Sequence, residues 1–420
     1  MKHLLFITII LIFQGTLEKI VPIIGYFDEI LLLLLMCTLF FKYTTNKIEI
    51  KLYRAEIYIA ILILIFFTIG IISNLNYGLG GNILYYFTSG ILTIKNFLVY
   101  ILARIVFRKI QINENLLLKL NKLFDFILNI YVTIILLDIP FNFLQGYGIR
   151  YNLIKSVSVG FSHPAELDFM AFSIMVIQLF IFKILNLNMK KYKYTLIKSF
   201  IIVFFGGRTK GLVFYVIYVI PFILSKLLKK IKLLHVLVCT PFIVKISKER
   251  FLSEFFNTES VRGTLYRIGY KIANDFYPLG SGFATYGTEF SRKKYSSLYY
   301  YYGISNKYGL SPNWPAYITD AHWAAIIGET GIFGVLTYAI ICIIFTYNLV
   351  SFNKCDLQLR LSITALWIYG LISSVSDTIL MSYRGVAISF ITAFFINIIL
   401  NKDDISQKDI KISENCKEYN

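Results

Sequence analysis

Long apolar runs recur along this chain and decide what it can fold into. A helix needs about 20 mostly apolar residues to cross the hydrocarbon core of a bilayer, and backbone groups there must be hydrogen-bonded within the segment. Runs this long and unbroken suit helices, not the alternating strands of a membrane barrel. The runs lie at roughly 4–14, 20–41, 57–73, 83–103, 123–138, 167–185, 195–205, 212–225, 233–244, 322–347, 361–376 and 386–400. The sequence therefore predicts an all-α polytopic integral membrane protein, with a single membrane domain over residues 1–420 and about twelve transmembrane helices.

Composition excludes the water-soluble classes of protein. Only 16% of the 420 residues are charged and 57% are hydrophobic, whereas a soluble domain has about 25% charged residues. The net charge of +18 would suggest nucleic acid in a soluble protein. In a membrane protein it reflects lysines that collect in cytoplasmic loops, so no nucleic-acid partner is expected. The N-terminus imitates a signal peptide but has no cleavage site, so it is interpreted as the first span.

The positions of lysine and arginine predict the orientation. Positive residues cluster after the second, fourth, sixth and eighth apolar runs, and cytoplasmic loops carry such clusters. Both termini are therefore expected in the cytoplasm, with segments 139–166 and 245–321 on the outside. The clusters are Lys42, Lys47, Lys51 and Arg54; Arg104, Arg108, Lys109, Lys119 and Lys122; Lys190, Lys191 and Lys193; and Lys226, Lys229, Lys230 and Lys232.

This topology limits the chemistry. No predicted cytoplasmic loop exceeds about twenty residues, and none has a glycine-rich phosphate-binding motif. The large loop at 245–321 lies outside, where ATP and nucleotide sugars are absent. A reaction there needs a preactivated substrate, of which a lipid pyrophosphate is the usual one, and basic residues at the membrane surface would suit it.

The outer loop contains a predicted amphipathic helix. Its apolar residues recur every three or four positions, at Val261, Leu265, Ile268, Ile272 and Phe276. Thr258 and Ser260 are candidate caps before it, and the segment 278–282 (PLGSG) would end it. Arg262, Arg267 and Tyr270 lie on this helix. One alternative remains open, in which the helix rests on the membrane surface with its basic residues on lipid headgroups.

A second group of polar residues opens the span that follows. Asp320, His322 and Glu329 precede Gly331 and Gly334, and a charge at membrane depth costs at least about 2.5–3.5 kcal/mol. Such residues are therefore candidates for a functional site. The structural alternatives are that Asp320 caps the helix, that Glu329 bonds a neighbouring helix, and that the glycines allow close helix packing.

These segments resemble the O-antigen polymerase and O-antigen ligase superfamily. The similar residues are SVRGTLYRIGYKIANDFYPLGSGFATYG (260–287), then Asp320, His322 and ETGIFG (329–334), covering roughly residues 255–340. The YFDEI run (26–30) and the Gly-rich hairpin at 206–211 add weaker support. The resemblance implies a C-type helical glycosyltransferase of the bacterial cytoplasmic (inner) membrane, which acts on undecaprenyl-pyrophosphate-linked glycans without a metal or cofactor.

The resemblance also assigns roles. Arg208 and Arg262 match arginines that hold the donor pyrophosphate, and Arg267 is a second candidate on the same helix. In the ligases a histidine stands at a fixed spacing before Gly-x-x-Gly. Counting back from Gly331 reaches Asp320 and not His322, so either residue could be the catalytic base, and the departure favours polymerase over ligase.

The implied function is polymerisation of lipid-linked repeat units into O-antigen or capsular polysaccharide at the outer face of the membrane. Expected partners are donor and acceptor glycans on undecaprenyl pyrophosphate, the bilayer, and chain-length-regulator and flippase proteins. O-antigen ligation is the nearest alternative. A non-enzymatic flippase or transporter is the alternative from another class, but it would carry charge through the depth of its helices and often paired repeats. Here ionisable residues gather at the outer ends and no repeat is apparent, which favours an enzyme.

Three further residues are candidates for glycan binding. His163 lies in the other outer segment, where it could contact the acceptor or simply make a His-Pro turn. Tyr270 and Tyr300 belong to a tyrosine-rich loop, whose rings could stack on sugars or form an interfacial aromatic belt. The four histidines, at 3, 163, 235 and 322, have no metal-site spacing, so no metal is expected.

Overall fold

The chain is almost entirely helical in the computed structural model, which describes residues 1–45, 50, 52–110, 113–150, 154–187, 192–224, 257 and 260–417, with side chains as far as residue 402. The helices are α1 (Lys2–Leu17), α2 (Phe27–Thr44), α3 (Arg54–Tyr77), α4 (Ile83–Val106), α5 (Glu114–Phe141), α6 (Pro164–Ile184), α7 (Tyr192–Gly206), α8 (Thr209–Leu224), α10 (Val261–Asp275), α11 (Glu289–Lys293), α12 (Ser297–Tyr301), α13 (His322–Val350), α14 (Leu357–Ser374) and α15 (Tyr383–Lys417). Short 3₁₀ turns, η1 (Pro22–Tyr26) and η3 (Ile379–Met381), precede α2 and α15. One antiparallel hairpin that the sequence did not predict, β1 (Gly146–Arg150) with β2 (Ile154–Val157), lies in segment 139–166.

Seven helices of the described chain are long and apolar enough to cross a membrane. They are Pro22–Thr44, Arg54–Tyr77, Ile83–Val106, Glu114–Phe141, Pro164–Ile184, His322–Val350 and Tyr383–Lys402. The segments Lys2–Leu17 and Thr209–Ile223 are shorter apolar helices. The prediction of an all-α protein with apolar helices of membrane-spanning length is confirmed, whereas the total of twelve spans stays a prediction. The crossing predicted at 233–244 lies outside the described residues.

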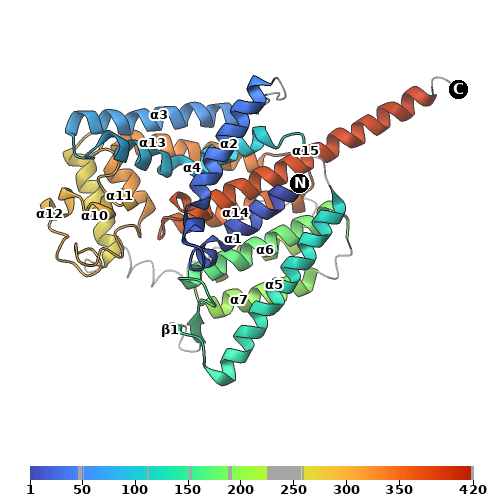
Figure 1. The fold of residues 1–420 in the computed structure, drawn as a ribbon, viewed down its shortest axis with the longest axis horizontal. Helices are drawn as coiled ribbons and strands as arrows, with labels where there is room; N and C mark the ends of the chain where they lie inside the picture. The colour runs from blue at the N-terminus through green and yellow to red at the C-terminus, as the bar shows by residue number, and fades with distance from the viewer. Residues whose placement is uncertain are drawn as a thin grey trace.

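The bundle has two opposite ends, each of which is identified by a contact between helix termini. At one end, the start of α6 contacts the start of α8 through His163 and Arg208. At the other, Lys402 of α15 donates a hydrogen bond to the carbonyl of Ile184, the last residue of α6, at 2.6 Å. We call the first the loop end and the second the far end. Figure 1 shows α10, α11 and α12 gathered on one side of the molecule and the last turns of α15 projecting from the other.

The middle of the bundle is formed by α6 and α15, which are buried along almost their whole membrane-length segments. Phe180 of α6 and Phe395 of α15 stack with ring centroids 3.9 Å apart. By contrast, α2, α3 and α5 bury less than a third of their apolar windows. The outer helices therefore leave apolar side chains for lipid, and α6 fixes the distance between the two ends.

The predicted amphipathic helix exists as α10. The Ser260 hydroxyl caps it by accepting a hydrogen bond from the Gly263 amide at 3.0 Å, while Thr258 lies outside the described residues. We call residues 260–321 the loop region. The apolar face of α10, with Leu265 and Ile272 fully buried, packs into a small core of this region. It also lies against α13, because a Cβ on Gly269 would come within 2.7 Å of the Ala324 carbonyl oxygen. The apolar face of α10 therefore packs against protein, and the alternative of a helix resting on the membrane surface is wrong for that face.

Candidate functional site

A break in α13 positions the loop region. Gly331 has φ 58° and ψ −160° in the middle of the helix, a backbone conformation that favours glycine. The segment after α10 fills the break, because the amides of Ser281 and Gly282 donate to the carbonyls of Gly328 and Glu329 at 2.9 and 2.8 Å. A Cβ on Gly331 would lie 2.7 Å from the Leu279 carbonyl carbon. The PLGSG and ETGIFG motifs thus bind each other, and the glycine does more than allow two helices to pack closely.

Glu329 also binds the loop that follows α10. One carboxylate oxygen accepts hydrogen bonds from the amides of Thr285 and Tyr286 at 2.9 and 3.1 Å and from the Thr288 hydroxyl at 2.9 Å. The residue is only 2% exposed, and hydrogen bonds of this kind offset the cost of burying a carboxylate. Glu329 therefore orders the loop, and its partners are loop residues and not the neighbouring helix that was one alternative.

Two further hydrogen bonds attach the loop region to the end of α14. The Tyr266 hydroxyl on α10 donates to the Val375 carbonyl at 2.8 Å. The Trp323 indole at the start of α13 donates to the Ser374 hydroxyl at 2.9 Å. The starts of α10 and α13 are therefore held beside the turn between α14 and α15.

Arg262 and Asp320 meet at this position. The Arg262 Nη2 lies 3.2 Å from an Asp320 carboxylate oxygen, and the two side chains are 28% and 34% exposed. Asp320 does not cap α13, because the N-cap is Ala321 and no side chain bonds there. The capping alternative is therefore wrong, and Asp320 forms a partly exposed ion pair with a predicted donor-binding arginine.

His322, the other candidate base, is enclosed by aromatic rings. It is fully buried, with ring centroids 5.8 Å from Trp323 and 5.4 Å from Tyr338. Neither ring nitrogen has a hydrogen-bond partner among the described residues. The negative charge of Asp377 is near enough to act on it. His322 is thus closed off from solvent in this conformation.

Asp377 links two further cations. Arg384, at the start of α15, makes a two-pronged contact with both carboxylate oxygens at 2.9 and 3.0 Å, and Lys210 of α8 lies 3.2 Å from one of them. Burial alone would raise the pKa of Asp377, but the charges of Arg384 and Lys210 outweigh it and hold the pKa well below its usual value. Asp377 therefore stays ionised and organises the two cations.

Arg208 contacts the imidazole of His163. Its guanidinium lies against Nε2 of His163, while the His163 Nδ1 accepts a hydrogen bond from the Ala165 amide at 3.2 Å and caps α6. Partial burial and the positive charge of Arg208 lower the pKa of His163. The His-Pro pair is thus a helix cap, and it also brings His163 to the predicted pyrophosphate-binding arginine.

Electrostatic interactions connect these contacts into one group. The charge of Arg262 acts on Lys210, and those of Arg208 and Lys210 act on Asp168, whose carboxylate has no hydrogen-bond partner in the part of the chain that is described. We call the following residues the loop-end cluster: His163, Arg208, Lys210, Arg262, Asp320, His322, Asp377 and Arg384. This set combines four cations, two carboxylates and two imidazoles, so it can bind a polyanion and accept a proton.

Three predicted residues lie elsewhere on the loop region. Arg267 is exposed, and its Nε donates a long hydrogen bond of 3.4 Å to the Gly263 carbonyl of its own helix. Tyr270 and Tyr300 are 65% and 57% exposed. Their roles in donor and glycan binding stay predictions.

The YFDEI run contributes a separate buried ion-pair group. Asp28 contacts Lys95 of α4 and accepts a hydrogen bond from the Gln14 amide at 2.7 Å, while Glu29 lies 2.8 Å from Lys95. These contacts join α1, α2 and α4 and require no ligand.

The sequence did not predict Lys210, Asp377 or Arg384 as site residues. The two cations could have been found, because the predicted topology puts Lys210 and Arg384, like Arg208, in outer turns, where positive residues are uncommon. A positive residue in a predicted outer turn is therefore a candidate for a functional role. Asp377 has no such signal.

Comparison with known proteins adds no assignment. No protein-family model matches the chain, and no curated protein matches it.

Proposed function

We propose that this protein is a polysaccharide polymerase that transfers a glycan from undecaprenyl pyrophosphate to a lipid-linked acceptor, without a metal. The observation that carries the proposal is the convergence of Arg208, Lys210, Arg262 and Arg384 beside two candidate bases at one end of an apolar helical bundle. A lipid pyrophosphate places its charge at the membrane surface, and charge-assisted contacts from arginine suit its oxygens.

Donor binding would change the state of Asp320. In the free protein Asp320 is paired with Arg262 at 3.2 Å, so the carboxylate faces a guanidinium and not an acceptor hydroxyl. A pyrophosphate that takes over Arg262 would release the carboxylate beside the reaction. Donor binding and activation of the base would then be one event.

The proposed reaction is a displacement at the anomeric carbon. The acceptor sugar hydroxyl attacks that carbon, its proton passes to the Asp320 carboxylate, and the bond from the anomeric carbon to the pyrophosphate oxygen breaks. The lipid pyrophosphate leaves with the bonding electrons, and the arginines stabilise the negative charge that develops on it.

Two alternatives are tested by the same variants. A ligase would share the donor but use a lipid A core acceptor, so the identity of the product separates the two activities. A flippase would move lipid-linked glycan without forming a bond. Among the described residues, charges deeper in the bundle are already paired with one another, as Lys95 is with Asp28 and Arg104 with Glu56. A cluster at one end, as opposed to a path through the bundle, favours an enzyme.

The proposal places the loop end outside the bacterial cytoplasmic membrane, with both termini inside. A reporter that works only after export, fused at Ser297 of α12, should then be active. Activity of a cytoplasm-only reporter at the same site would reverse the orientation and separate the cluster from its proposed substrate.

The decisive experiment compares three arginines in purified protein supplied with lipid-linked repeat units. Arg208→Ala and Arg262→Ala should each abolish long polymer, because a lost contact to a charged group costs about 1.5–3 kcal/mol. Lysine should restore activity only in part, since it lacks the forked donor geometry. Arg292→Ala is the matched control, because Arg292 pairs with Glu289 at 2.6 Å within the same loop region but outside the cluster. Normal chain lengths in both cluster variants, or equal loss in the control, would refute the proposal.

A further inference from the structure

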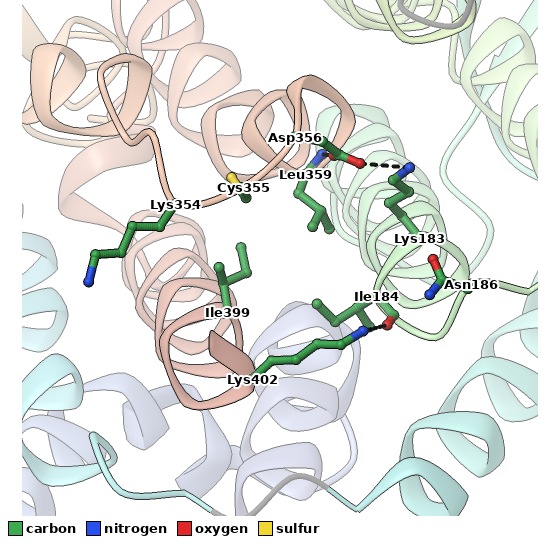
Figure 2. A pocket seen from close by; sticks show the side chains of 9 residues that line it. All are labelled: Lys183, Ile184, Asn186, Lys354, Cys355, Asp356, Leu359, Ile399 and Lys402. Carbon is green, nitrogen blue, oxygen red and sulfur yellow. Dashed lines mark hydrogen bonds and ion pairs between the residues drawn. The ribbon is translucent and has the colours of Figure 1, made fainter. Parts of the chain in front are cut away.

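The far end of the bundle contains a pocket that the proposed function does not use. It has a volume of about 200 Å³ and is lined by Lys183, Ile184, Asn186, Lys354, Cys355, Asp356, Leu359, Ile399 and Lys402. These residues come from the end of α6, the turn between α13 and α14, the start of α14, and α15. Figure 2 shows their side chains arranged around the pocket, with Lys354 and Lys183 on opposite sides in this view.

The position of the pocket corresponds to a membrane surface. α6 has 21 residues, so at 1.5 Å per residue it spans about 31 Å, close to the ~30 Å hydrocarbon core of a bilayer. His163 and the loop-end cluster lie at its start, and the pocket lies at its end. If the cluster lies at one membrane surface, the pocket lies at the headgroup level of the opposite leaflet.

The charges of the pocket favour an anion. Three lysines surround it against a single carboxylate, Asp356. Asp356 is already engaged twice: one oxygen lies 2.6 Å from Lys183, and the other accepts a hydrogen bond from the Leu359 amide at 3.0 Å. Lys354 is exposed and has no hydrogen-bond or ion-pair partner among the described residues. Its flexible stem can therefore turn toward an anion without breaking a pair.

Three apolar residues also line the pocket. Ile184, Leu359 and Ile399 are buried at 4%, 8% and 2% exposure and contribute to its lining. These side chains are already packed against protein, so a lipid is favoured by the position of the pocket at the headgroup level, where acyl chains in the bilayer hold a phosphate in place. Basic pockets between helix ends at a membrane surface suit anionic headgroups.

We propose that this pocket binds the phosphate headgroup of an anionic phospholipid from the leaflet at the far end. Lys354 and Lys402 contact the phosphate, and the acyl chains extend from the pocket into the surrounding bilayer. The bound lipid joins the ends of α6, α14 and α15. This inference depends on α6 spanning the membrane and not on the enzymatic activity.

The test measures lipid binding by the full-length protein purified in detergent. Phosphatidylglycerol is added to the wild type and to the Lys354→Ala/Lys402→Ala variant, and retained lipid is counted by native mass spectrometry. Each lysine near an anionic surface contributes roughly a fivefold effect, so the double variant should bind about 30-fold more weakly. Because Lys402→Ala also removes the hydrogen bond to Ile184, Lys354→Ala is measured alone as well. It removes only an exposed side chain and should bind about fivefold more weakly.

The matched control is Lys119→Ala/Lys122→Ala, which removes the same charge from exposed positions near the start of α5. It should bind phosphatidylglycerol as the wild type does. Equal weakening in both double variants would overturn the proposal, because any surface lysine would then suffice. Equal affinity for phosphatidylcholine, or for inorganic phosphate alone, would also overturn it by removing the need for an anionic lipid.

Discussion

Two arginine–carboxylate pairs lie at opposite ends of the bundle and differ in almost every physical respect. At the far end, the Arg104 Nε lies 2.8 Å from a Glu56 carboxylate oxygen, and the two side chains are 1% and 0% exposed. At the loop end, Arg262 and Asp320 are 3.2 Å apart with side chains 28% and 34% exposed. The chemistry of the two pairs is the same, but only the second is accessible to a ligand.

The surroundings of the two pairs differ as well. Glu56 also accepts hydrogen bonds from the Tyr100 hydroxyl at 3.0 Å and the Tyr53 amide at 2.8 Å, and Arg104 contacts the side chain of Asn397. These partners close the network, as a buried ion pair requires. In the loop-end cluster, by contrast, His322 has no hydrogen-bond partner for either ring nitrogen among the described residues. The far-end pair is therefore a completed network, whereas the loop-end cluster contains a buried imidazole without such partners.

The largest expected effect concerns the base. Asp320→Asn should lower the rate of polymer formation by about 10²- to 10⁴-fold, the typical contribution of a positioned base. Protein level should change little, because a partly exposed ion pair contributes at most about 1 kcal/mol. The measurement is single-turnover formation of the glycosidic bond with purified protein.

His322→Gln provides the other arm of this test. Near-normal turnover in His322→Gln, together with loss in Asp320→Asn, would assign the base to the carboxylate. The opposite pattern would assign it to His322 and imply that the aromatic enclosure opens during the reaction. Two active variants would show that neither residue is the base.

The second prediction concerns stability at the far end. Glu56→Gln leaves the buried Arg104 charge uncompensated, so it should cost about 3–5 kcal/mol of folding free energy. Thermal unfolding in detergent should show the loss, while Asp320→Asn, the matched change in the open pair, shows little. Glu56→Gln combined with Arg104→Met should recover most of the stability, because it removes both buried charges. A double variant as unstable as Glu56→Gln alone would contradict the comparison.

The elements that could be predicted from the sequence depend on local patterns. The apolar runs, α10 with its Ser260 cap, and the tight turn between α7 and α8 each follow from residues a few positions apart. The predicted arginines Arg208 and Arg262 do lie in one electrostatic group. Their environment could not be predicted, because it is made by distant segments: Lys210 and Asp377 are 167 positions apart.

The break in α13 shows the same limit in another form. Gly331 and Glu329 were recognisable as unusual residues at the start of a span. Nothing in their spacing indicated that the loop after α10 fills the break, or that Glu329 bonds its amides. A motif of a glycine and a carboxylate can mark a functional site or a structural contact that supports the site. Here Gly331 and Glu329 belong to the contact between α13 and the loop after α10.

The smallest expected effect is the pH dependence of the Arg208–His163 contact. Since partial burial and Arg208 lower the pKa of His163, the folded protein prefers the neutral ring. The stabilisation from this contact is then fully present above the unfolded pKa of about 6.5 and is lost as the pH falls below it. His163→Asn keeps a good helix cap but cannot titrate. Lowering the pH from 7 to 5 should therefore destabilise the wild type more than His163→Asn, by less than about 1 kcal/mol because the contact is solvent-accessible. His322 is present in both proteins, so the difference in thermal unfolding reports on His163 alone. Identical pH dependence in the two proteins would mean that Arg208 does not make protonation of His163 less favourable. The position of Arg208 at the loop end would then not depend on a neutral imidazole.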